Sequence, residues 1–152
     1  MSKVDKSKAP AGSGSRYPSP FDEPCRGRSW LRLGDAAGLS QFGVNLVQLE
    51  PGAWSSQRHW HSHEDEFVYV LSGELVLVTD EGEDLLQAGD SAGFKAGVKN
   101  GHCLQNRTAQ VSRFLVVGSR SDEDRGEYPD IDMAFKSESD GGGFIHKDGT
   151  PY

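Results

Sequence analysis

Two histidines one residue apart, His59 and His61, are the residues of this chain whose type and spacing point most directly to chemistry. Alternate side chains of a β-strand face the same side, so an extended segment would direct both imidazoles into one space. Burying two strong hydrogen-bonding groups together costs free energy unless a partner satisfies them. A metal ion is the simplest partner, and a carboxylate from the acidic stretch that follows could complete its ligands.

Several residues of that stretch compete for the carboxylate role. Glu64 and Asp65 lie in a polar segment, where a solvated acidic face is the ordinary explanation. Glu66 begins an apolar run, so we expect it to be the ligand, with Glu64 as the alternative. His63 falls in the same polar segment and is expected to be exposed or to lie behind the ligands. His146, near the end of the chain, is expected at the surface.

The elements that must position these residues are predicted to be short β-strands. Apolar and β-branched runs alternate with glycine-rich turns, and no long amphipathic helix is evident. This pattern predicts an all-β barrel or sandwich. The predicted strands cover residues 42–52, 57–61, 66–71, 74–79, 84–87, 94–97, 101–106 and 111–117.

The length of 152 residues corresponds to one domain with extensions. Residues 1–20 are rich in Ser, Lys, Pro and Gly, so we expect this segment to be disordered. Residues 21–120 are expected to form the barrel. Residues 121–152 are acidic but carry aromatic side chains, and we expect this extension to pack on the barrel or on a partner subunit.

Charge and composition exclude several classes of partner. The net charge of -7 argues against nucleic acid, because that binding needs clustered Lys and Arg. No apolar run of about 18 residues is present to span a membrane, and the N-terminus lacks the apolar block of a secretory signal. Cys25 and Cys103 have no metal-like or redox-like spacing, so free thiols are expected. These features predict a cytoplasmic protein whose partner is a small molecule.

The histidine segment resembles the first motif of the cupin superfamily. That motif places a glycine before His-x-His, a glutamate shortly after it, and a second glycine separated from the glutamate by six residues. Gly52, His59, His61, Glu66 and Gly73 occupy these positions, with six residues instead of the usual five between Gly52 and His59. The spacing to Gly73 favours Glu66 over its acidic neighbours.

A second stretch resembles the second cupin motif, which contributes another histidine. Gly89 is followed by Lys95, where proline is usual, and by Gly97, His102 and Asn106. The loop before His102 is two residues longer than in the usual motif. Asn106 could hydrogen-bond inside the barrel or stabilise a turn.

The resemblance implies a single double-stranded β-helix, the jelly-roll barrel of cupins. It also implies that His59, His61, Glu66 and His102 converge inside the barrel on a divalent transition metal. Three imidazoles and one carboxylate suit Fe, Mn, Ni, Zn or Cu, and they leave positions open for water or substrate.

The implied function is an enzyme that acts on a small polar metabolite through this metal. Small cupins similar to this chain are often named sugar-phosphate isomerases, and a dioxygenase-like reaction fits the ligands as well. An isomerase needs an acid or base to move a proton, and none is evident. The alternative is a non-catalytic cupin that binds or senses a small molecule.

Two cations near the motifs could meet an anionic substrate. Lys95 and Arg58 could form charge-assisted hydrogen bonds, although a solvated lysine and an outward-facing arginine are the ordinary explanations. The alternation of Phe67, Tyr69 and Leu71 predicts an apolar outer face on one strand. We therefore expect a homodimer.

Overall fold

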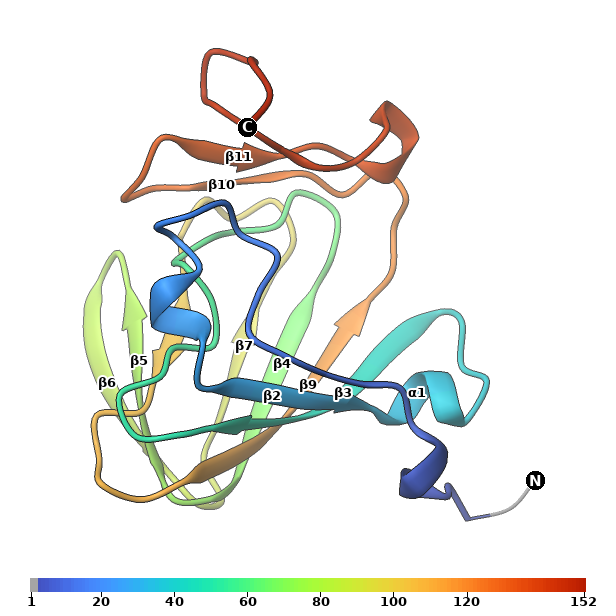
Figure 1. Ribbon diagram of the computed structural model, residues 1–152, viewed down its shortest axis with the longest axis vertical. Coiled ribbons are helices and arrows are strands. Elements are labelled where there is room, and N and C mark those ends of the chain that lie inside the picture. The colour runs from blue at the N-terminus through green and yellow to red at the C-terminus, as the bar shows by residue number, and fades with distance from the viewer. Residues whose placement is uncertain (1–2) are drawn as a thin grey trace.

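The computed structural model describes residues 3–152 and consists mainly of β-strands arranged in three sheets (Figure 1). Over these residues, no helix has the length and apolar character needed to cross a membrane. In chain order the elements are η1 (Lys6–Lys8), β1 (Ala11–Ser13), η2 (Glu23–Cys25), β2 (Arg28–Arg32), α1 (Leu33–Ala36), β3 (Phe42–Leu49), β4 (Glu66–Ser72), β5 (Glu74–Thr79), β6 (Gly82–Gln87), β7 (Ser91–Phe94), β8 (Cys103–Gln105), β9 (Ser112–Ser119), β10 (Gly126–Tyr128), β11 (Met133–Phe135), η3 (Glu138–Asp140) and β12 (Phe144–Ile145).

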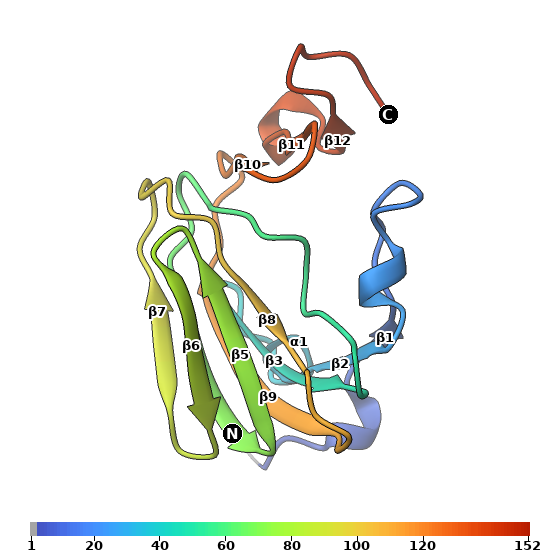
Figure 2. The same ribbon diagram turned by 90° about the vertical axis from the view of Figure 1, so that its left-hand side faces the viewer.

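Two of the sheets pack face to face (Figure 2). The larger has the strand order β1-β2-β3-β9-β4-β7 and the smaller the order β6-β5-β8. The mostly β fold is confirmed. Strand pairing within residues 3–152 does not join the two sheets edge to edge, so closure into a double-stranded β-helix stays a prediction. Apolar side chains from both sheets form one core, made of Val47, Leu49, Ala53, Val68, Val70, Leu75, Leu77, Leu86, Leu104 and Phe114.

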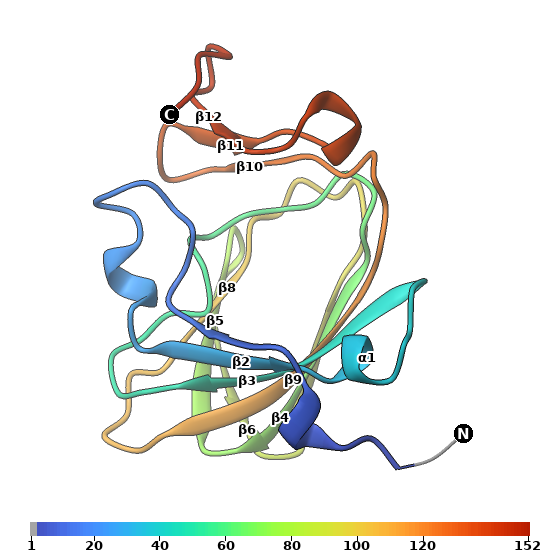
Figure 3. The same cartoon turned by 45° about the vertical axis from the view of Figure 1, so that its right-hand side comes forward.

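The third sheet, β10-β11-β12, lies across one end of this sandwich (Figures 1 and 3). It belongs to residues 121–152, for which we expect packing on the barrel or a partner. Arg58 ties it to the sandwich, because its guanidinium pairs with both Asp80, after β5, and Asp130, after β10. Tyr17 adds an aromatic contact, with its ring centroid 5.4 Å from that of Tyr128.

The N-terminal segment departs from the disorder that its composition predicts. Residues 1 and 2 lie outside the described residues, but β1 pairs antiparallel with β2 from Ala11 to Ser13. The ring of Tyr17 also packs between Tyr128 and Phe144. Backbone hydrogen bonds and a single aromatic anchor do not require the apolar composition on which the prediction depended.

The strand predicted at residues 57–61 is wrong. This stretch is a loop that forms one isolated bridge, between His59 and His102. Its next backbone donors, Trp60 and Ser62, bond to carbonyls at and just before β10 instead of to a neighbouring sheet strand. The C-terminal extension, residues 121–152, therefore supplies the backbone hydrogen bonds that a neighbouring sheet strand was expected to supply.

The outer face of β4 carries three large apolar side chains. Phe67, Tyr69 and Leu71 are 45%, 41% and 44% exposed. Their alternation matches the sequence pattern, and the homodimer expected from this face stays a prediction.

Two glycines of the histidine motif adopt the left-handed conformation, Gly52 in the turn after β3 and Gly73 in the turn between β4 and β5. Gly52 and Gly73 both have φ of 80°, a region that L side chains rarely adopt. A Cβ at Gly73 would overlap the Ser112 side chain and lie 2.9 Å from Ser112 Cα, whereas a Cβ at Gly52 would meet nothing within 4 Å. Gly73 is thus required both by its backbone conformation and by close packing.

We predict that Gly73→Ala destabilises the fold more than Gly52→Ala does. Since both positions have the same φ, the left-handed conformation should cost about 1–2 kcal/mol in each variant. Overpacking against Ser112 should add about 1–3 kcal/mol at Gly73 alone. Urea unfolding of both variants measures the difference, and equal losses of stability would contradict the close packing at Gly73.

Candidate metal centre

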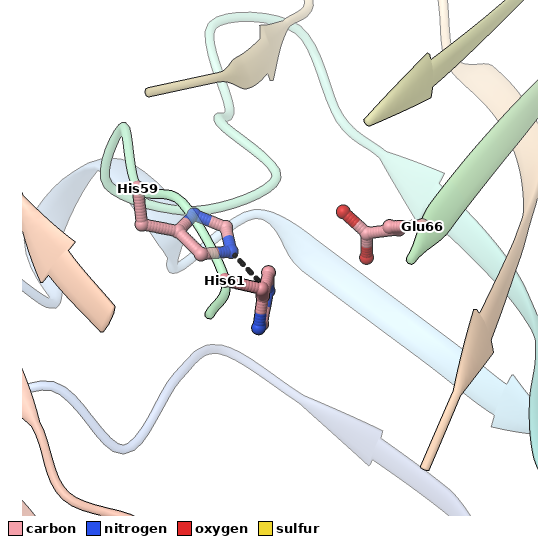
Figure 4. A group of neighbouring side chains, drawn as sticks. All are labelled: His59, His61 and Glu66. Atoms are coloured by element: carbon pink, nitrogen blue, oxygen red, sulfur yellow. Dashed lines mark hydrogen bonds between the residues drawn. The ribbon is translucent and has the colours of Figure 1, made fainter. Parts of the chain in front are cut away.

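The four residues expected to bind a metal lie close together. His59 and His61 come from the loop before β4, Glu66 is the first residue of β4, and His102 immediately precedes β8. One ligand atom each of His59, His61 and Glu66 lies within 4.8 Å of the others, and the carboxylate faces the two rings across a gap (Figure 4). His102 joins them through its Nε2, which is 2.8 Å from Glu66 Oε2.

Hydrogen bonds fix which nitrogen of each paired ring carries its proton. His59 Nδ1 lies 2.9 Å from the carbonyl of Gln57, which can only accept, so this nitrogen is the donor. His61 Nδ1 lies 2.6 Å from Asp124 Oδ2 and donates to that carboxylate. In the neutral rings both Nε2 atoms therefore present lone pairs, and these atoms are 3.0 Å apart. Facing lone pairs repel each other unless a cation, either a proton or a metal ion, lies between them.

The electrostatics of the pair differ from one ring to the other. Burial, together with the neighbouring His61 and His102, lowers the pKa of His59 to about 3, so this ring is neutral at pH 7. Burial also opposes charge on His61, but the hydrogen bond to Asp124 and the charges of Glu66, Asp124 and Glu64 together outweigh it and raise the pKa of that ring. Without a metal, His61 is the ring that takes up the shared proton.

Glu66 supplies the negative charge at the centre. Burial would raise its pKa, but the hydrogen bond from His102 and the surrounding imidazoles outweigh that effect and lower the pKa to about 2. Glu66 is therefore ionised at neutral pH. A carboxylate beside neutral imidazoles is a nitrogen and oxygen donor set that suits a divalent transition metal.

The ring of His102 is buried and stacks on an aromatic side chain. It is 4% exposed and stacks on Phe94 with ring centroids 3.6 Å apart and planes 3° apart. Its Nδ1 is buried and has no hydrogen-bond partner among residues 3–152. Nε2, which donates to Glu66, is the atom that could bind a metal after losing that proton.

Asp124 is a site residue that the sequence analysis missed. It is 8% exposed, and besides its bond to His61 it accepts the backbone N–H groups of His63 at 2.9 Å and Glu64 at 3.2 Å. A carboxylate that holds the second nitrogen of a ligand histidine fixes its orientation and raises its basicity. No sequence signal distinguishes Asp124, because it stands in a run of acidic residues that resembles a solvated surface.

The other acidic and histidine candidates lie outside the quartet. Glu64 accepts the N–H of Ser121 at 2.9 Å and groups with His61 and Asp124, not with Glu66. His63 is exposed. A second group that could hold a metal consists of His61, Glu64 and Asp124. It shares His61 with the group formed by His59, His61 and Glu66.

Arg58 and Lys95 do not face the four predicted ligands. Arg58 is engaged by Asp80 and Asp130, as an outward-facing residue would be. Lys95 is exposed and borders a different cavity, beside Leu77. Asn106 is fully buried and stabilises a turn, since its amide donates to the carbonyls of Leu49 and Gln110.

The histidine pair borders an open cavity of about 460 Å³ beside the third sheet, β10-β11-β12. A smaller cavity of about 120 Å³ lies between the two sheets of the sandwich and is bordered by Glu66 and His102. Space for a small molecule therefore exists on both sides of the ligand cluster. The larger cavity is lined by Arg16, His59, His61, Tyr128, Phe135, Lys136, Glu138, Gly143 and Phe144.

Comparisons with known proteins place the chain in a family. A cupin domain model matches residues 45–118. A cupin-superfamily protein from Silicibacter pomeroyi, named a sugar phosphate isomerase, is 51% identical over 99% of this chain and 96% of its own, with a TM-score of 0.94. The chain therefore belongs to the cupin superfamily.

Two further structures extend the comparison. A protein from Acidithiobacillus ferrooxidans, provisionally named a sugar phosphate isomerase, is 31% identical over 82% of this chain and 80% of its own, with a TM-score of 0.75. The polyketide cyclase RemF from Streptomyces resistomycificus shares the fold at 23% identity over 78% of this chain and 79% of its own, with a TM-score of 0.63. Curated protein sequences contain no match.

Proposed function

We propose that this cupin is a metal-dependent enzyme that isomerises a sugar phosphate. The observation that carries the proposal is the pair of opposed His59 and His61 Nε2 atoms, 3.0 Å apart beside Glu66 and at the wall of a cavity. Glu66, His102 and the two opposed rings would hold a divalent metal. When bound, such an ion polarises a carbonyl or hydroxyl oxygen as a Lewis acid.

The names of the relatives support the choice of reaction. The proteins from Silicibacter pomeroyi and Acidithiobacillus ferrooxidans that match this chain at 51% and 31% identity are both named sugar phosphate isomerases. The higher match covers 99% of this chain, so it includes the tail that walls the larger cavity.

The cavity also offers the proton-transfer groups that an isomerase needs. Glu138 is the one carboxylate among the described residues that line it, and it is exposed to solvent. Burial raises the pKa of Tyr128 well above its usual range, so its hydroxyl keeps its proton and can donate a hydrogen bond to a substrate oxygen. We assign Glu138 as the base that moves the proton and Tyr128 as a substrate-orienting donor.

We predict that protein purified without a metal-affinity tag contains close to one transition-metal ion per chain. The double variant His59→Ala, His61→Ala should lose that metal, because both opposed Nε2 atoms are removed. Elemental analysis measures both contents. The matched control, His63→Ala with His146→Ala, removes two imidazoles that lie outside the cluster and should keep the metal; retention of the metal by the first variant would contradict the assignment.

Asp124→Asn is predicted to weaken metal binding about 10- to 100-fold without unfolding the protein. The amide oxygen can still accept the His61 N–H, but it carries no negative charge, so the ring loses the basicity that the carboxylate gives it. Competition with a fluorescent chelator measures the affinity. Glu123→Gln is the matched control, since that exposed neighbour makes no side-chain hydrogen bond among residues 3–152; equal affinities for the two variants would rule out the role of Asp124.

Metal-loaded protein is predicted to interconvert an aldose and a ketose phosphate, and Glu138→Gln should lower kcat by at least about 100-fold with the metal content unchanged. A panel of sugar phosphates followed by proton NMR measures turnover. Glu127→Gln, which neutralises an exposed carboxylate of β10, serves as the control. If ligands raise the melting temperature but none is consumed, the chain is a binding or sensor cupin; oxygen uptake in place of isomerisation would indicate a dioxygenase.

A further inference from the structure

A cavity of about 350 Å³ between the N-terminal segment and β2 has an unusual charge for this protein. The chain carries a net charge of -7, yet this cavity is bordered by three arginines, Arg16, Arg28 and Arg32, and by no carboxylate. Its remaining lining is polar or aromatic and consists of Ser15, Tyr17, Trp30, Asn45, Tyr128 and Phe144.

Strand register places Arg28 and Arg32 on the same face of β2, where Arg28 is largely buried and Arg32, at the strand end, is exposed and pairs with Asp35 at 3.9 Å. Arg28 is paired directly with Leu49 of β3, and Arg32 with Asn45. Directly opposed residues of antiparallel strands project from the same face. Leu49 is fully buried in the core, so Arg28 faces the space between the sheets. A strand position that faces a core is normally apolar, and an arginine there needs another explanation.

Arg28 leaves most of its donors unused. Its guanidinium lies 4.6 Å above the Trp30 ring, and it makes a single hydrogen bond, of 3.4 Å, to the carbonyl of Gly14. Its Nε is buried and has no partner among residues 3–152. A buried charged donor without an acceptor costs free energy. An anion in the cavity would supply the missing acceptors.

Arg58 shows how the same side chain behaves when its donors are satisfied. The hydrogen bond to Asp130 and the contact with Asp80 raise the pKa of Arg58. Burial lowers the pKa of Arg28, and the charges of nearby groups, Glu66 among them, offset this only in part; among residues 3–152 no carboxylate forms an ion pair with it. Arg58 links the third sheet to the sandwich, whereas the Arg28 guanidinium remains available to bind an anion.

The arginine cavity adjoins the ligand cluster on two sides. Arg28 and Asn45 also border the 120 Å³ cavity that contains Glu66 and His102. Arg16 also borders the larger cavity on His59 and His61, and so do Tyr128 and Phe144. One elongated small molecule could therefore contact both an arginine and the ligand cluster.

We propose that Arg28, together with Arg16 and Arg32, forms an anion subsite that binds the phosphate group of a phosphomonoester whose other end lies at the histidine cluster. A phosphomonoester dianion offers three terminal oxygens, which suit the planar forks of several guanidinium groups. The statement that this phosphomonoester is a substrate rests on the proposed function; the subsite itself does not.

Calorimetric titration of inorganic phosphate into the full chain tests the subsite. We expect saturable binding of about one phosphate per chain, both in the wild type and in His59→Ala, His61→Ala, where a metal cannot hold the anion. Arg28→Gln should weaken binding about 10- to 100-fold, because it removes charge-assisted hydrogen bonds. Arg16→Gln should weaken it less, since Arg16 is exposed.

Arg113→Gln is the matched control for overall charge. It removes one arginine from an exposed position on β9, where the side chain bonds to Gln48, and phosphate affinity should stay unchanged. Arg28→Gln should not lower the urea midpoint, because the Arg28 Nε is unsatisfied in the free protein. If that variant nevertheless unfolds, Arg16→Gln decides, since an exposed side chain can be replaced without disturbing the core.

Three results would overturn the subsite. These are equal phosphate affinity in the wild type and in the Arg28 and Arg16 variants, loss of binding in the His59 and His61 double variant, and tighter binding of acetate than of phosphate. The outcome is independent of turnover. Phosphate binding through Arg28 without any isomerisation would keep the subsite and contradict the proposed function, and isomerisation of a sugar phosphate at an unchanged rate by Arg28→Gln and Arg16→Gln, without phosphate binding, would do the reverse.

Discussion

The site depends on one constraint, the opposition of two imidazole nitrogens that both carry lone pairs. The Gln57 carbonyl takes the proton of one ring and Asp124 that of the other, so the two Nε2 atoms meet 3.0 Å apart with nothing to donate. Only a cation relieves that contact. The flanking residues are consistent with it, because Glu66 brings a negative charge and His102 a further imidazole from the opposite strand.

The arginines of this acidic chain fall into two groups with different surroundings. Arg107 makes two hydrogen bonds of 2.7 Å to Glu83, and Arg58 pairs with carboxylates on both the sandwich and the tail. These residues join surface segments. Arg16 and Arg28 have no carboxylate partner within residues 3–152 and border one cavity. Local placement, not net charge, therefore sets the sign of the potential where an anionic molecule would enter.

The sequence predicted the elements that depend on local signals better than those that depend on contacts with distant parts of the chain. Strand β5 was predicted to the residue, because alternation and flanking turns are local signals. The stretch 57–61 was not a strand, because its backbone partners come from the tail, far along the chain. Glu66 could be selected by its distance to Gly73. Asp124 could not, since nothing in an acidic run marks the one carboxylate that folding buries.

The cupin match spans residues 45–118 and contains the whole ligand quartet, whereas the groups that wall the 460 Å³ and 350 Å³ cavities come largely from outside it. Arg16 and Arg28 precede the match, and Asp124, Tyr128 and Glu138 follow it. The ligand quartet and most of the groups that wall these two cavities thus come from separate parts of the chain. Mutations in the two ends can therefore change what is bound while the metal ligands stay in place, so a shared cupin core is weak evidence of a shared substrate.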